Sequence, residues 1–196
     1  MHWPANPLWD YALELYGSEG VEAACLELQE RHGLDVNLLL LCCWLAGRGI
    51  AADEAVFRRI ADVTEVWQEE VVRPLRGVRS RLKARLVAAQ PESVAARWPE
   101  LAATLRQRAL GLEIDGERLE QLLLAELAAS LAPTATPGAA LASANLRLYR
   151  PFTAADRPPL ITLLQAAFPD VSKSELAASL DWLEQGAGQG QPWPHE

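Results

Sequence analysis

The sequence predicts an all-α globular fold, a bundle of about six helices with two or three further helices appended towards the C-terminus. Apolar residues recur at steps of three and four through most of the chain, and glycine, proline and capping residues separate these stretches. No convincing two-residue alternation, the pattern typical of a strand, occurs in the first 132 residues. With 50% hydrophobic and 22% charged residues over 196 positions, the composition is that of a folded globular protein.

The first three helices are predicted from the residues at their ends. Asn6-Pro7 is an N-cap followed by proline in the first turn, so a helix is expected over 7–16. A second helix is expected over 20–32, followed by glycine in the C′ position. Asp35 can accept amide hydrogens of the next turn, which predicts a third helix over 35–47. This third segment is apolar nearly all round and is expected at the centre of the core.

The middle of the chain is predicted to form longer helices. Asp53 opens a region with helical apolar spacing, which Pro74 interrupts, so we expect a kink or break near Val72–Arg73 and then a helix to about residue 88. A further helix is expected to begin around Pro91 and Ser93. Ile114-Asp115-Gly116 is expected to form a turn or cap before a helix that ends near residue 132.

A proline-containing loop over 133–138 is the best candidate for a domain boundary. We therefore predict a helical core domain over 1–132 and a helical appendage over 139–185. The helices of the appendage are expected at 139–149, at about 154–168 and after Ser172, where Ser172 to Glu175 fits the capping-box pattern. Residues 186–196 have too little to bury and are expected to be disordered.

Charge and cysteine content narrow the setting of the protein. The net charge of −8 argues against a general attraction to nucleic acid or anionic lipid. No stretch approaches the roughly 20 apolar residues of a membrane span, and the first residues lack the features of a signal peptide. We therefore expect a cytoplasmic protein with no membrane partner. The three cysteines, Cys25, Cys42 and Cys43, form no CxxC pair and are expected to be reduced core residues.

Several segments carry a resemblance to a known family. They are residues 8–11 with Leu15-Tyr16, residues 20–29, residues 33–40 with Trp44, and Trp67 followed by residues 72–76 and Arg79. Over about residues 6–130 the chain resembles a family of small proteobacterial helical proteins of unknown function, most specifically in Asp-Val-Asn-Leu-Leu-Leu at 35–40. The resemblance implies no activity, and it does not extend to the segment after Pro133.

A basic segment around Pro74 is the strongest chemical feature. Its six cations fall within thirteen residues that contain no acid: Arg73, Arg76, Arg79, Arg81, Lys83 and Arg85. On a helix, an apolar stripe formed by Leu75, Val78, Leu82 and Leu86 would have cations on both flanks. Such a face could dock onto RNA phosphates or an acidic protein surface. Alternatively, it is a solvated face whose arginines pair with acids of the chain such as Glu65, Glu69 and Glu70.

Six further polar residues are candidates for a polar pocket. They are Asp10 and Glu14, Glu65 and Glu69, and the pair Asp35 and Asn37. Carboxylates one helical turn apart share a face and can hold a metal ion, but no Glu-x-x-His motif or Asp-rich repeat accompanies them. Solvated charge is therefore the simpler interpretation of the two carboxylate pairs. A hydrogen-bonded structural role is favoured for Asp35 and Asn37, with pocket lining as the alternative.

No motif in the sequence assigns a reaction. His2 and His195 lie near the chain ends, and His32 is placed to complement a helix C-terminus rather than to act as a base. No catalytic residue, metal or other cofactor is predicted, and a non-enzymatic role is favoured. The favoured hypothesis is a module that binds a protein partner through the basic helix or an apolar groove. RNA or ribosome binding through the same cations and a helical enzyme or ligand carrier built on the carboxylates are the alternatives. The oligomeric state is not predicted.

Overall fold

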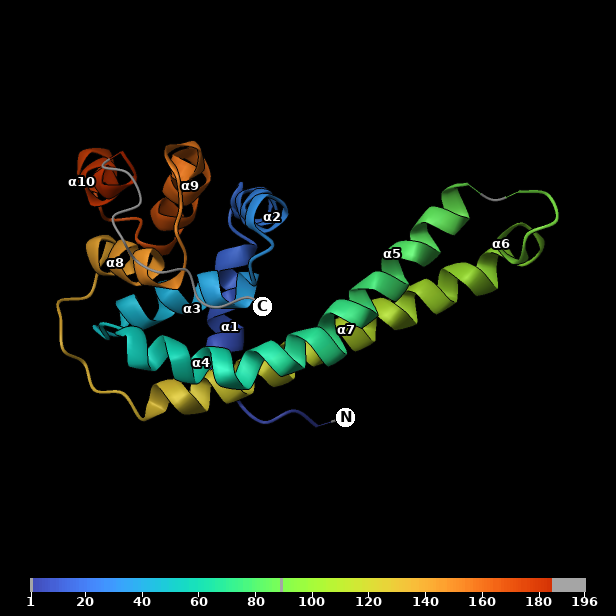
Figure 1. Cartoon of the computed structure of the whole chain (residues 1–196), viewed down its shortest axis with the longest axis horizontal. Helices are drawn as coiled ribbons and strands as arrows, with labels where there is room; N and C mark the ends of the chain where they lie inside the picture. Colours follow the sequence, from blue (N-terminus) through green and yellow to red (C-terminus); the bar gives the residue numbers. More distant parts are fainter. Residues whose placement is uncertain (1, 89, 185–196) are drawn as a thin grey trace. The chain divides into compact units, whose positions relative to one another are not determined.

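The structure is a computed structural model that describes residues 2–88 and 90–184, and within these ranges it contains helices and loops but no strand (Figure 1). The all-α prediction is confirmed. The described residues divide into two compact units, 2–59 with 124–184 and 60–123. The divisions fall inside two continuous helices, α4 (Glu54–Trp67) and α7 (Pro99–Ala129). No described helix has both the length and the apolar character needed to cross a bilayer.

The centre of the first unit is α3 (Val36–Gly47). Ten consecutive residues, Asn37 to Ala46, are buried. Because this helix is apolar on all sides, neighbours have to cover it on several faces. It packs against α1 (Pro7–Tyr16), α2 (Val21–His32) and α8 (Ala139–Tyr149), so its predicted central position is confirmed.

The predicted capping residues act as expected at these helices. The side chain of Asn6 accepts a hydrogen bond from the Trp9 amide at 3.1 Å, and that of Asp35 accepts one from the Asn37 amide at 2.8 Å. Gly33 ends α2 in the left-handed conformation, with φ of +62°. The first three helices therefore begin and end within a residue of their predicted bounds.

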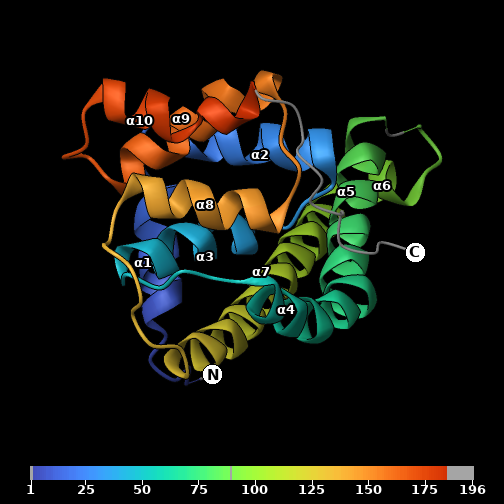
Figure 2. The same ribbon diagram turned by 60° about the vertical axis from the view of Figure 1, so that its left-hand side comes forward.

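The helices after the proline-containing loop belong to the same compact unit as α1 to α3. They comprise α8, the 3₁₀ turn η2 (Ala154–Asp156), α9 (Arg157–Ala167), α10 (Lys173–Ser179) and the 3₁₀ turn η3 (Asp181–Leu183). In Figure 2, α8 lies between α3 and the layer of α9 and α10, and α9 also packs on α2. This grouping differs from the division drawn at 133–138, because α3 requires α8 to cover one of its faces. The expected disorder of 186–196 concerns residues outside the described part of the chain.

Two buried polar side chains join the C-terminal helices to the N-terminal ones. Asn145 of α8 accepts from the Ala52 amide at 2.9 Å and donates to the carbonyls of Cys42 and Ile50. Asp156 accepts from the amide and hydroxyl of Thr153 and from the guanidinium of Arg31, at the end of α2. Burial opposes ionisation of Asp156, but these hydrogen bonds and one with His32 outweigh it and hold the pKa of its carboxyl below the ordinary value.

The second unit contains an antiparallel pair of helices, α5 (Arg73–Val87) and the first part of α7, with the short α6 (Val94–Arg97) between them (Figure 1). A π-helical turn, Gln68–Val72, precedes α5 at the position of the predicted kink or break. Proline lacks an amide hydrogen and crowds the carbonyl four residues before it, and the wider π turn accommodates this. The amide of Arg73 accordingly donates to the carbonyl of Gln68, five residues earlier.

The predicted turn at 114–116 is wrong, because α7 continues through Ile114, Asp115 and Gly116 as one helix. Packing against the preceding segment compensates for the low helix propensity of glycine. The indole of Trp67 donates to the Gly116 carbonyl at 3.0 Å, and the Val72 side chain lies 3.5 Å from the position that a Cβ would take. Gly116 therefore marks a helix–helix contact.

Replacing Gly116 with alanine tests this correction. A Cβ at this position meets its neighbours at ordinary van der Waals distance, so Gly116→Ala should raise the free energy of unfolding by about 0.5–1 kcal/mol through helix propensity. Urea unfolding followed by circular dichroism measures the change. A loss of stability would instead indicate a turn conformation that only glycine adopts.

Removing the Asn145 side chain tests the junction between α8 and α3. Asn145→Ala leaves one backbone amide and two carbonyls without their buried partner, so the free energy of unfolding should fall by about 3 kcal/mol. Ala144→Ser, an exposed change on the same helix, is the control and should shift it by less than about 0.5 kcal/mol. Similar stability of the two variants would contradict the assigned role.

Candidate functional site

Three of the six cations of the basic segment form ion pairs within the second unit, namely Arg73, Arg76 and Arg79. Glu113 of α7 lies 2.9 Å from Nε of Arg76 and 3.1 Å from Nη2 of Arg79, and its second oxygen accepts from Nε of Arg79. Glu117 adds a contact of 2.8 Å to Arg76. These contacts, which we call the Glu113 clamp, hold α5 against α7.

The Glu113 clamp is electrostatically tight. Glu113 is only 4% exposed, and burial by itself would favour the protonated acid. The hydrogen bonds from Arg79 and Arg76 outweigh this effect and hold the pKa of the Glu113 carboxyl below its ordinary value. The clamp is therefore charged at neutral pH and neutralises part of the basic segment.

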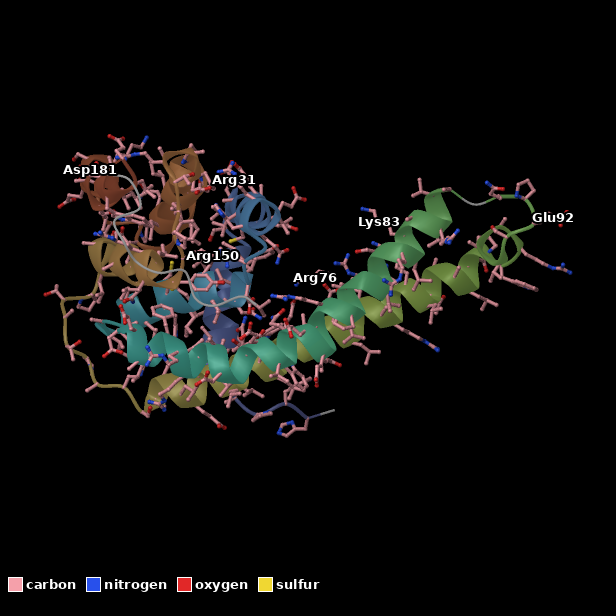
Figure 3. The ribbon with its side chains drawn as sticks, in the orientation of Figure 1. Arg31, Arg76, Lys83, Glu92, Arg150 and Asp181 are labelled. Carbon is pink, nitrogen blue, oxygen red and sulfur yellow. The ribbon has the colours of Figure 1, made fainter. Side chains whose placement is uncertain are left out.

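The far half of α5 has a different environment. Arg81, Lys83 and Arg85 are exposed and form no ion pair with any residue that the structure describes. Figure 3 shows Lys83 nearer than Arg76 to the end of α5 that leads towards Glu92. Arg73, at the other end, lies 3.8 Å from Glu69, and both side chains are more than half exposed. We refer to Arg81, Lys83 and Arg85 as the distal cations.

The surroundings of the distal cations are also basic. Residues 73–108 contain nine Arg or Lys residues and two acids, Glu92 and Glu100, a net charge of +9 − 2 = +7. The other residues of the chain then sum to −8 − 7 = −15. The positive charge of this acidic protein is thus concentrated in one part of the second unit.

Apolar side chains are exposed in the same part of the chain. No side chain of α5 is buried, and Leu101, Leu105 and Leu112 of α7 are 68%, 54% and 56% exposed. They are four and seven residues apart, a helical spacing that would ordinarily place them in a core. Only the structure shows that these side chains stay more than half exposed in the described chain, and exposed apolar surface can mark an interaction site.

The carboxylate candidates lie in different units. Asp10 and Glu14 are exposed on α1 in the first unit, whereas Glu65 and Glu69 belong to the second. Asp35 caps α3, and its backbone exchanges hydrogen bonds with the hydroxyl of Tyr149, while Asn37 is buried. Among the described residues, no three His, Cys, Asp or Glu side chains form a group that could hold a metal ion.

The three cysteines and His32, which could act as nucleophiles or a base, belong to the first unit. All three cysteines are buried and unpaired, and burial raises the pKa of the Cys25 thiol to about 12. His32 lies with Nε2 at 2.9 Å from Asp156 and its ring edge-on to Phe152. A protonated, buried thiol is a poor nucleophile, so these groups are suited to packing.

Comparison with known proteins identifies a family but no activity. A family model described as "Protein of unknown function (DUF2390)" matches residues 7–124. Neither a curated protein nor a solved structure matches the chain. The matched range includes all of the second unit, with the Glu113 clamp and the distal cations, and it ends before α8.

Neutralising Glu113 tests the clamp. Glu113→Gln leaves two arginines facing an uncharged side chain, so the free energy of unfolding at pH 7 should fall by about 2 kcal/mol. Because the folded pKa of Glu113 is lowered, its contribution is complete above the ordinary value of 4.5 and disappears as the pH falls through the folded value. Urea unfolding at pH 7 and at pH 3 should therefore show a smaller difference between wild type and variant at the lower pH.

The control for this prediction is Glu100→Gln, which changes an exposed acid on the same helix. It should shift the unfolding free energy by less than about 0.5 kcal/mol. A difference between wild type and Glu113→Gln that stays constant from pH 7 to pH 3 would contradict the role of an ionised Glu113.

Proposed function

The chain belongs to the DUF2390 family, whose function is unknown, and from the geometry of its basic helix we propose that the protein is a non-catalytic module that binds an acidic protein partner. The contact surface of this module is the far half of α5 with the adjoining part of α7. One observation carries the proposal. The Glu113 clamp neutralises Arg76 and Arg79, whereas the distal cations stay exposed and without ion pairs among the described residues.

The charge of the whole chain makes this observation informative. Acids outnumber bases by 26 to 18, so pairing partners are abundant, yet the distal cations do not use them. Two of the three are arginines, whose planar guanidinium forms paired hydrogen bonds with carboxylates. An external acidic surface would satisfy these cations, and the apolar side chains beside them favour a protein.

Nucleic acid is the second candidate, since the same cations could contact phosphates. Single-stranded RNA is usually held by aromatic side chains that stack on its bases. No aromatic residue occurs from 73 to 97, and Trp98, the next one along the chain, has the Arg97 guanidinium 5.1 Å from its ring centroid. A protein partner therefore fits this surface better.

Site-specific photocrosslinking in cells that express the protein tests the proposal. A photocrosslinking amino acid replaces Lys83 in one variant and Lys173, the only other lysine and also exposed, in the control. Position 83 should give a discrete protein adduct that position 173 lacks, mapped to an acidic segment of the partner. The combined change Arg81→Ala and Arg85→Ala should reduce the adduct severalfold, because charged contacts steer the encounter.

Two results would overturn the proposal. Adducts to RNA that depend on Arg81 and Arg85 would show that the surface binds nucleic acid and not a protein. Identical adduct patterns at positions 83 and 173 would show that the distal cations contact no partner.

A further inference from the structure

The exposed apolar residues indicate which element of a partner this surface receives. Resting on the proposed function, we infer that the partner contributes an amphipathic α-helix with acidic flanks, which packs along α5 and α7 and completes a three-helix bundle. Its docking surface, which we call the open face, comprises Val78 and Leu82 of α5 with Leu101, Leu105 and Leu112 of α7.

Helical geometry places these five residues on one side of the helix pair. Arg79 and Glu113 join the two helices, and Val78 and Leu112 each precede one of them by a single residue. In an antiparallel helix pair, two residues that precede the joining residues of their helices by the same number of positions point to the same side of the pair. The flanking positions of antiparallel coiled coils follow the same geometry. Leu82 and Leu105 follow at helical spacing from the joining residues on that same side.

The open face has the dimensions and chemistry of a helix-binding surface. Leu101, Leu105 and Leu112 extend over twelve residues of α7, about three helical turns. Two-helix hairpins leave one apolar side of each helix uncovered, and a third helix that packs on both of them buries it. This explains why no side chain of α5 is buried although Leu75, Leu82 and Leu86 repeat at core spacing.

The positive charge beside the open face favours an acidic partner helix. Arg85 of α5 and Arg108 of α7 lie on the same side of the hairpin as the open face by helical spacing, and both are exposed. Acidic residues that flank the apolar stripe of a partner helix would pair with them. A second copy of this hairpin would bring its own Arg85 and Arg108 into the contact, and like charges oppose that arrangement. An acidic helix is therefore favoured over self-association.

A synthetic peptide tests the inference on the full chain. The probe is a fluorescent 21-residue peptide with leucine at heptad positions a and d and glutamate at e and g. One control peptide has the same composition with its leucines scrambled, and another has glutamine at e and g. Only the probe should bind tightly by fluorescence anisotropy, and it should gain helical circular dichroism on binding.

Matched variants locate the binding surface. Leu112 and Leu13 are both 56% exposed leucines on helices, but Leu13 is on α1. Leu112→Glu should weaken probe binding at least about tenfold, because it places a buried acid in the contact, whereas Leu13→Glu should change it less than about twofold. Arg85→Glu should also weaken binding, and more strongly at low salt than at high salt.

The outcomes separate this inference from the proposed function. Equal binding of the probe and the scrambled peptide, or no binding of either while crosslinks at position 83 persist, would overturn the helix and leave an acidic partner in place. If the full chain neither binds the probe nor gives a specific crosslink at position 83, both proposals are contradicted. A homodimer in sedimentation experiments that Leu112→Glu dissociates would show that a second copy occupies the open face.

Discussion

A pair of helices cannot enclose a hydrophobic core, and this constraint governs the second unit of the protein. In the first unit, α3 is covered by α1, α2 and α8, and burial of apolar surface holds the helices together. In the second unit α5 has no buried side chain. Polar contacts take over there: the Glu113 clamp joins α5 to α7, and the Trp67 indole binds the Gly116 carbonyl near the start of the pair.

The position of the clamp divides the basic segment into two parts. Arg76 and Arg79 lie within reach of Glu113 and are neutralised, whereas the distal cations lie farther along α5, where α7 offers Arg106 and Arg108 instead of acids. The same part of the pair exposes Leu101 and Leu105. Positive charge and uncovered apolar surface thus occur together, which is the combination that an acidic amphipathic helix would satisfy.

Local features of the fold could be predicted from the sequence, whereas features that depend on distant residues could not. Capping residues such as Asn6 and Asp35 act through neighbours within three residues, so the bounds of their helices were predicted closely. A turn was predicted at Gly116 from the local sequence, because the contact with Trp67 that keeps it helical comes from a residue 49 positions away. The pairing of Arg79 with Glu113 likewise spans 34 residues, and the exposure of Leu105 depends on the absence of a covering element among the described residues. Of the candidate site, the sequence therefore identified the basic residues, the apolar stripe beside them on α5 and Glu69 as a partner of the segment, but not the pairing with Glu113 or the exposed leucines of α7.

Amide hydrogen exchange of the full chain tests most directly whether the far half of α5 lacks a core of its own. Helices without buried side chains open locally at low free-energy cost. Amides from 80 to 87 should exchange at least about 100-fold faster than those of Leu39 to Cys43 in α3, and saturation with the acidic helical probe should slow them. Protection of α5 equal to that of α3 in the free protein would show that the hairpin is complete by itself and needs no third helix.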